Sequence, residues 1–433
     1  GKQGGGLGGG GQKPTDDPDF VRWTEGMQLE GSPLGTSYVV EAYVASGTFS
    51  RVFRVRAEPP AGEAAAPEAR AGKRRWVAAG SAAEPAAAGR GAVYAAKVMR
   101  KHDSYIQYTS NAEKEGTLLQ KLEKAQCSLG RELLTMRCVD SFATKDAAGA
   151  EYWCLILEWL DASLFDVVRA NGGRGLHLAV ARALLAQLLE QLRALQELDC
   201  THTDIKHKNC CLADTEHFMA AAGPGDRPTL ILTRPAAKFI DYGNAVFEGE
   251  EKGHPIHTKQ FRAPEVLLNV TGGWGPPSDT WTLGVTAAYL VSGQLIFNSH
   301  DPGELVQLMV EALGPFPERF LARARDGRLR RTLQSAAQQR AAEQPRLGDR
   351  LGFGGAAPSS AEGRCVDLLL RMLAPDPAER ITPAEALKHP FITVEEPRVP
   401  QRPAGAELRT LSGDQEGGGG APRGAGRGGR RGG

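Results

Sequence analysis

The stretch "CTHTDIKHKNC", residues 200–210, follows a long segment with leucines at helical spacing. It places an aspartate, a lysine and an asparagine close together: Asp204, Lys206 and Asn209. This spacing matches H-R-D-x-x-x-x-N, a pattern typical of loops that handle phosphoryl groups. Thr203 stands where the pattern has arginine. The other motifs of the chain are therefore needed to tell whether threonine at position 203 removes a function or changes its regulation.

The composition is that of an ordinary globular protein. The chain has 433 residues, of which 41% are hydrophobic and 24% charged, enough for two packed units. Its 52 basic and 51 acidic residues leave a net charge of +1, which argues against polyanion binding by the chain as a whole. Seven cysteines without paired C-x-x-C spacing favour a reducing compartment, so we expect the nucleus and/or the cytoplasm.

The chain has no apolar run long enough to span a bilayer, and we expect no membrane contact. We also expect a monomer. Because the first residue is glycine rather than methionine, we expect a fragment whose true N-terminus lies elsewhere.

Two glycine-rich ends, residues 1–37 and 393–433, are predicted to be disordered because neither can bury enough apolar surface to offset its ordering entropy. The second end interleaves arginine with glycine, as nucleic-acid-binding tails do. RNA contact and a merely solvated low-complexity end are both compatible with this composition.

Between the ends, the residue patterns predict an α+β protein with two lobes. Residues 38–160 contain four short β-rich runs and one helical segment, whereas residues 161–392 are mostly helical. The stretch 58–90 is rich in alanine, proline, glycine and arginine, and we expect a disordered insertion between strands.

Lys97, in "VYAAK", lies on an apolar strand where an ammonium group is costly unless it has partners. Strand lysines commonly extend to water, but a carboxylate on the following helix could pair with this one. Glu115 is in phase with the leucines of that helix, and Glu113 is the competing choice. We predict a Lys97–Glu115 pair that holds the lysine toward phosphate oxygens.

Upstream, "VASGTFSRV" occupies the place of a phosphate-covering G-x-G-x-x-G loop but has Ala45, Gly47 and Ser50 at the three glycine positions. Gly47 still permits close approach of the backbone, and Phe49 can cap the loop. One glycine of the three is only weak evidence for a phosphate-covering loop. We expect this loop to be stiffer than one with all three glycines.

Phosphoryl transfer depends mainly on the placement of charge. Asp204 would accept the proton of a substrate hydroxyl or orient that hydroxyl, and Lys206 would neutralise the transferred group. Asn209 and Asp241, the latter in "KFIDYGNAV", would bind magnesium (Mg²⁺). Each of these residues alone could be an ordinary turn residue or a solvated surface charge. Their occurrence together, in the order and spacing of the pattern, argues against that interpretation.

Two further motifs predict structural contacts. Glu265, in "QFRAPEVLL", should form a buried pair with Arg380 in "DPAERIT". Asp279 heads an apolar helix, where it could cap that helix or hold the backbone of the catalytic loop.

These motifs, in this order, resemble those of a eukaryotic protein kinase over residues 38–392. The resemblance implies the two-lobed fold, ATP and Mg²⁺ in the cleft, and Ser/Thr protein substrates. Within that family the segment resembles the CMGC group, and two branches linked to splicing compete. "GTFSRVFRVRA" and "GLHLAVARALLAQLL" are similar to the pre-mRNA-processing-factor-four kinases, which are DYRK-related, and this branch is preferred. "THTDIK" and "ALKHPFI" look more like the LAMMER (Clk) kinases. Either branch implies substrates among splicing proteins, including Arg/Ser-rich factors.

The resemblance also implies the nucleotide contacts. Leu157 would be the gatekeeper, while Glu158 and Leu160 would give hinge backbone hydrogen bonds to adenine. Above and below the ring, and at the ribose, it implies contacts from Ala45, Val52, Ala95, Leu212 and Asp166.

In many kinases the arginine missing at Thr203 binds a phosphate on the activation segment. That segment, "EEKGHPIHTKQFRAPE", contains no tyrosine, although Thr258 could be phosphorylated. We therefore predict a segment held by neutral contacts and active without phosphorylation. The alternative function is a pseudokinase scaffold that binds splicing partners or RNA through its insertions and its Arg/Gly tail.

Overall fold

The computed structural model describes most of the chain, and the fold is reported for those parts only: residues 23–47, 50–58, 91–99, 106–128, 135–221, 227–250, 256–339 and 347–411. The predicted insertion at 58–90 lies outside the described residues from position 59 onward. Phe49 also lies outside them.

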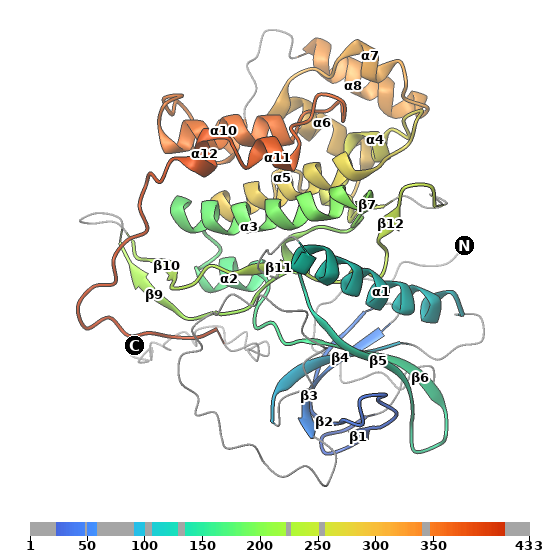
Figure 1. Ribbon diagram of the computed structural model, residues 1–433. Coiled ribbons are helices and arrows are strands. Elements are labelled where there is room, and N and C mark those ends of the chain that lie inside the picture. The colour runs from blue at the N-terminus through green and yellow to red at the C-terminus, as the bar shows by residue number, and fades with distance from the viewer. Residues whose placement is uncertain are drawn as a thin grey trace, which may run out of the picture.

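The N-terminal lobe is a six-stranded sheet with neighbouring strands antiparallel (Figure 1). Its spatial order is β1 (Gln28–Leu29), β2 (Ser37–Ser46), β3 (Ser50–Glu58), β4 (Val93–Met99), β6 (Glu151–Glu158) and β5 (Cys138–Lys145). Helix α1 (Ile106–Ser128) packs on this sheet. Leu118, Leu119 and Leu122 of α1 are at most 1% exposed, because they recur at the spacing that keeps side chains on one helix face.

The C-terminal lobe is mostly helical, as predicted (Figure 1). Its helices are α2 (Leu164–Ala170), α3 (Leu178–Glu197), α4 (Pro264–Leu267), α5 (Pro276–Ser292), α6 (Pro302–Leu313), α7 (Glu318–Leu321), α8 (Gly327–Gln339), α9 (Leu347–Arg350), α10 (Ala361–Met372), α11 (Pro383–Ala386) and α12 (Pro390–Thr393). Helix α5 is buried along almost its whole length and packs against α3. No helix in the described ranges is both long and apolar enough to cross a membrane.

Three short antiparallel strand pairs lie in the C-terminal lobe (Figure 1). They are β7 (Cys200–Thr201) with β12 (Val246–Phe247), β8 (Cys210–Leu212) with β11 (Ala237–Phe239), and β9 (His217–Ala220) with β10 (Thr229–Leu232). The first two pairs matter for function, because they join the segments after and before Asp241, respectively, to the two ends of the catalytic loop.

The predicted disorder of residues 1–37 is wrong for residues 23–37. Strand β1 pairs with β2, Leu29 is fully buried, and Trp23 is only 8% exposed. The ring of Trp23 lies 5.6 Å from Phe53 and 6.4 Å from Tyr152, centroid to centroid. The glycine content of this segment led to the wrong prediction. Trp23 and Leu29 are apolar, but the residues they pack against come together only in the folded sheet.

The predicted disorder of residues 393–433 is likewise wrong for residues 393–411. Buried Arg182 donates to the backbone carbonyls of Glu396 and Pro397, at 2.8 and 3.0 Å. Further on, Arg409 forms a backbone bridge with His217 on β9. The segment therefore follows the C-terminal lobe down to the β9–β10 hairpin (Figure 1).

Replacing Trp23 by alanine should lower the free energy of unfolding by about 3–5 kcal/mol, because it empties a buried aromatic site. Leu34→Ala is the control: Leu34 is 39% exposed, and its loss should cost less than about 0.5 kcal/mol. Urea unfolding of both variants measures the difference. Equal midpoints for the two variants would contradict a packed role for Trp23.

Candidate active site

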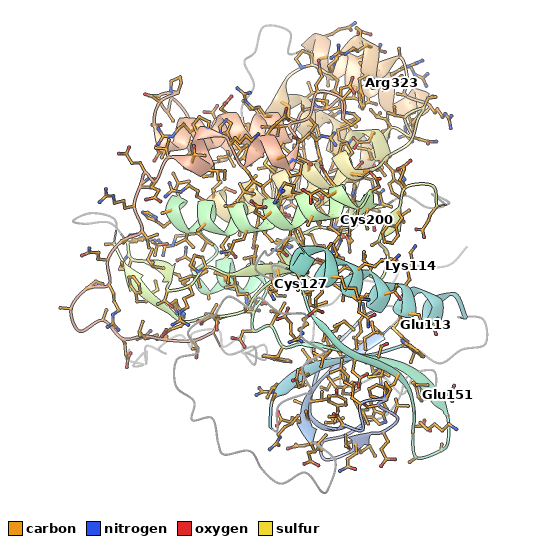
Figure 2. All side chains as sticks on the ribbon, viewed as in Figure 1. Glu113, Lys114, Cys127, Glu151, Cys200 and Arg323 are labelled. Atoms are coloured by element: carbon orange, nitrogen blue, oxygen red, sulfur yellow. The ribbon has the colours of Figure 1, made fainter. Side chains whose placement is uncertain are left out.

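A cluster of three charged side chains joins the two lobes. Lys97 Nζ lies 2.7 Å from Glu115 Oε2 and 2.8 Å from Asp241 Oδ1. Glu115 is 1% exposed, and its second oxygen accepts a hydrogen bond from the backbone N–H of Tyr242 at 3.0 Å. The competing residue, Glu113, is exposed on α1, so helix phase selected the correct partner (Figure 2).

The charges of this cluster stabilise one another. Burial alone would lower the pKa of Lys97, but the two carboxylates outweigh burial and raise it above its ordinary value. The nearby Lys97 ammonium lowers the pKa of Asp241 against the effect of burial. A Cβ at Gly243 would lie 3.3 Å from Glu115 Oε2, so the glycine leaves room beside the cluster.

The catalytic loop carries a second cluster around Asp204. Its Oδ2 accepts from Lys206 Nζ at 2.7 Å and from Asn209 Nδ2 at 3.1 Å. Its Oδ1 accepts from the hydroxyl of Thr258 at 2.9 Å, and Lys206 donates to that same hydroxyl at 3.0 Å. The sequence alone predicts Thr258 only as a candidate phosphosite. Its contact with Asp204 was missed, because no local pattern links residues so far apart along the chain.

Asp279 holds the backbone of the catalytic loop. Its carboxylate is fully buried and accepts from the N–H groups of His202 and Thr203, the latter at 3.1 Å. The alternative role of helix capping does not apply, since Gly275 is the N-cap of α5. Thr203 has φ +74°, a left-handed conformation that costs about 1–2 kcal/mol for a residue with a Cβ. The two hydrogen bonds to Asp279 help to offset that cost.

Thr203 itself contacts the activation segment through neutral groups. Its hydroxyl donates to the carbonyl of Asn244 at 3.0 Å, and its own carbonyl accepts from the N–H of His257 at 3.0 Å. The position that carries arginine in the phosphoryl-transfer pattern therefore joins Asn244, which follows Asp241, to the activation segment here without charge.

The activation segment is also joined to α1. Lys114 Nζ lies 2.5 Å from Glu250 Oε2, and that carboxylate accepts from the N–H of Phe247 at 2.9 Å. Lys121, further along α1, lies over the ring of Phe247 at 5.2 Å. Figure 2 marks Lys114 on α1, the helix that also carries Glu115.

His207 lies in an aromatic enclosure. Its ring centroid is 5.2 Å from Phe165, 5.2 Å from Phe261 and 4.5 Å from Tyr289. These rings come from α2, from the 3₁₀ turn at Lys259–Phe261 and from α5. Burial and the neighbouring Lys208 and Lys206 lower the pKa of His207 to about 4.

The predicted pair of Glu265 and Arg380 is present and bidentate, with N–O distances of 2.9 and 3.0 Å. Both residues are at most 5% exposed, and Ser278 donates a third hydrogen bond to Glu265 at 2.6 Å. The guanidinium group lies 5.4 Å over the ring of Trp281. This pair joins α4 to the turn after α10.

The residues predicted to bind the nucleotide come from both lobes. Ala95 pairs directly with Leu157 across β4 and β6, while Val52 pairs with both Ala45 and Lys97. From the C-terminal lobe come Leu212 on β8 and Asp166 on α2, and Leu160 follows β6. Their roles toward ATP stay predictions.

Two residues predicted to bind the nucleotide, Glu158 and Asp166, have contacts that the sequence did not indicate. The N–H of Glu158 donates to the carbonyl of Arg137 at 3.0 Å, so a hydrogen bond from Glu158 to adenine would use its carbonyl. The Glu158 side chain pairs with Lys238 at 2.6 Å. Asp166 caps α2 through Ser163 and pairs with Arg169 at 3.1 Å. At Gly47 a Cβ would meet only ordinary contacts at 3.7 Å, so the described structure does not itself require glycine there.

Asn209 and Asp241 fit a site for a divalent cation. They are adjacent because the N–H of Ile240 donates to the carbonyl of Asn209 at 2.9 Å. The Asp241 side chain is 44% exposed. Among the described residues no cluster of three or more His, Cys, Asp or Glu could hold a metal alone. Magnesium commonly binds one or two protein ligands together with substrate phosphates, which matches this donor set.

The enclosure of His207 predicts a pH dependence of stability. The ordinary pKa of 6.5 applies to the unfolded chain, so below that pH the unfolded chain binds more protons than the folded one. Stability is therefore lost as the pH falls from 7 toward 4. Between pH 7 and pH 5, His207→Phe should lose about 2 kcal/mol less free energy of unfolding than the wild type. Urea unfolding at both pH values measures this, with His300→Phe on the exposed surface as control. A wild-type loss no larger than that of His207→Phe would contradict the prediction.

Comparisons with known proteins agree with this geometry. The family model described as "Protein kinase domain" matches residues 78–392. A solved crystal structure of a kinase domain matches with a TM-score of 0.64 and 24% identity, covering 87% of this chain and 100% of that one. At that identity the structural match supports the fold alone.

Among curated relatives, serine/threonine-protein kinase AFC1 of Arabidopsis thaliana is 32% identical over 258 residues, or 55% of each chain. AFC3 of the same plant is 31% identical over 311 residues, which is 69% of this chain and 74% of AFC3. The human dual specificity protein kinase CLK1 is 29% identical over 263 residues, 59% of this chain and 53% of CLK1. The chain thus spans about half the length of AFC1 and CLK1.

These relatives lie on the LAMMER (Clk) side of the two branches considered from the sequence. The preference for the processing-factor-four branch has no support among them, whereas the resemblance to the CMGC group does. With the family match covering most of its length, this chain belongs to the protein kinase family and is similar to the LAMMER-type kinases of the CMGC group.

Proposed function

We propose that this chain is an active kinase that transfers the γ-phosphoryl group of ATP to serine or threonine hydroxyls of proteins. The observation that carries the proposal is the complete set of charged groups in two clusters. Lys97, Glu115 and Asp241 form one, and Asp204 and Lys206 lie in the other. Partly buried charges are costly unless they are paired, and here every one of them is paired. This arrangement fits a chain that carries out the reaction better than one that has lost it.

Each group has a distinct task in the proposed reaction. The hydroxyl oxygen of the substrate attacks the γ-phosphorus, its proton passes to Asp204, and ADP leaves. Lys206 neutralises charge on the transferred group, and Lys97, held by Glu115, binds the other phosphates. Asn209 and Asp241 would hold Mg²⁺, which neutralises the phosphate oxygens during transfer.

A scaffold without catalysis is the second candidate. It is favoured by one observation, the presence of Ala45 and Ser50 at two positions of the phosphate-covering loop where glycine is usual. In this case the insertions and the Arg/Gly tail would bind splicing partners or RNA.

Transfer of radiolabelled phosphate from ATP to Ser/Thr peptides separates the two candidates. Asp204→Asn should lower kcat by about 100-fold or more, because it removes the proton acceptor while keeping the shape of the side chain. Lys145→Gln is the control. Lys145 is an exposed residue of the N-terminal lobe, and its replacement should leave kcat unchanged. If wild type and Asp204→Asn gave the same background transfer, the scaffold would be preferred.

The activation segment is proposed to be competent without phosphorylation. Neutral hydrogen bonds from Thr203, the β7–β12 pairing and the Lys114–Glu250 ion pair support this. The position of Thr258 supports it further: a phosphate there would place negative charge against Asp204. Modification of Thr258 is therefore proposed to inhibit.

Phosphatase-treated protein should keep most of its kcat toward a Ser/Thr peptide, measured beside the untreated enzyme and phosphatase-treated Asp204→Asn. Mass spectrometry of the treated sample verifies that the segment carries no phosphate. Thr258→Ala cannot decide the question, because it also removes a hydrogen-bond donor to Asp204. Near-complete loss of activity that rephosphorylation restores would refute phosphorylation-independent activation.

The substrates are proposed to be splicing-related proteins, with the nucleus and/or cytoplasm as the site of action and a monomer as the working form. The relatives named above support a Ser/Thr or dual-specificity kinase. RNA contact through the Arg/Gly tail is a subsidiary proposal that rests on composition alone.

A further inference from the structure

Lys208 is the exposed residue of the catalytic loop. It sits in the 3₁₀ turn His207–Asn209, whose other two residues are only 7% and 8% exposed. Because the flanking side chains are directed into the protein, the backbone of this turn leaves the Lys208 side chain on the outer surface. An exposed lysine is usually a solvated charge without a role. Its surroundings are what distinguish this one.

The ammonium group of Lys208 has an aromatic partner but no acidic one. Its Nζ lies 4.8 Å from the centroid of Phe165, the second residue of α2. Within the described residues Lys208 forms no ion pair. The adjacent carboxylate of Asp166 is already engaged by Ser163 and by Arg169, at 3.1 Å from the latter. The surface between the catalytic loop and α2 therefore has two cations and one anion, a local excess of positive charge.

This surface adjoins the place where a target hydroxyl must bind. Asp204 lies four residues before Lys208, so at most about 14 Å of chain separates them. The neighbouring His207 ring contacts Phe261, just before the Ala263-Pro264-Glu265 motif at the end of the activation segment. We therefore expect a peptide whose hydroxyl reaches Asp204 to bring residues close to its target near Lys208.

We propose that Lys208 is a specificity-determining residue that favours peptide substrates carrying an anionic group, carboxylate or phosphate, within a few residues of the target hydroxyl. The inference rests on the proposed kinase function and names its substrate class. An arginine at the same place in the peptide meets a cation and is disfavoured. Unmodified Arg/Ser-rich segments are consequently poorer substrates than acidic or already phosphorylated ones.

The expected size of the effect follows from the exposure of the pair. An ion pair at a solvent-exposed surface changes a binding equilibrium by up to about five-fold, and salt screens it. The ring of Phe165 limits the positions of the ammonium group, which reduces the entropy lost when a peptide anion binds. The preference should therefore appear in kcat/KM at low ionic strength and weaken at high salt.

The test uses the full chain and a peptide series with one serine target. At each position beside the serine, in turn, the peptide carries alanine, glutamate, phosphoserine or arginine. For wild type, kcat/KM should rise about five-fold with glutamate or phosphoserine at one or two positions and fall with arginine there. Lys208→Ala should remove both effects, and Lys208→Glu should reverse them. Lys145→Glu, the same charge change on the N-terminal lobe, should leave the peptide ranking as in wild type.

The glutamate and phosphoserine peptides together show which anionic group Lys208 favours. A gain with glutamate and phosphoserine alike supports a general anion preference, and a gain with phosphoserine alone supports recognition of phosphorylated substrates. If the peptide ranking of Lys208→Glu equals that of wild type while transfer still depends on Asp204, the inference about Lys208 is wrong and the kinase function stands. If no peptide is phosphorylated in an Asp204-dependent way, it is the kinase function that fails.

Discussion

The hydrogen bonds that the buried carboxylate of Asp279 accepts hold the catalytic site together. A fully buried carboxylate is costly unless hydrogen bonds satisfy it, and here the N–H groups of His202 and Thr203 do so. They hold Thr203 in a left-handed conformation that its side chain disfavours. The following residue is Asp204, so the direction of the catalytic carboxylate depends on a helix far away in sequence.

The contacts of Thr203 explain how the catalytic loop does without arginine at this position. Arginine at position 203 would bring a cation that needs a phosphate or a carboxylate opposite it. Threonine instead donates to the carbonyl of Asn244 and accepts from the N–H of His257, so position 203 holds its neighbours without a charge of its own. Lys114 and Glu250 add a link to α1, which carries Glu115. In the proposed function, the way the segment is held at Thr203 and the reaction at Asp204 are thus separable properties of one loop.

Much of the site was predictable from the sequence, because chemistry requires particular residue types in a particular order. Helix phase was enough to prefer Glu115 over Glu113, since only the residue in line with the buried leucines can face the sheet. The contacts of Thr258 and the enclosure of His207 were not predictable, because their partners are distant in the chain and no periodic pattern links them. The segment around Trp23 was misjudged from its glycines alone.

The sequence by itself determined the α+β class, the identity of the charged groups and the order in which two lobes supply them. Hydrophobic periodicity and the cost of an unpaired buried charge are local constraints, and they can be read along a chain. Only the tertiary structure decided that Asp279 binds the loop rather than capping its helix, that Thr258 contacts Asp204, and that Lys208 keeps no acidic partner among the described residues. Each of these depends on which distant groups lie within a few ångströms, a quantity set by packing.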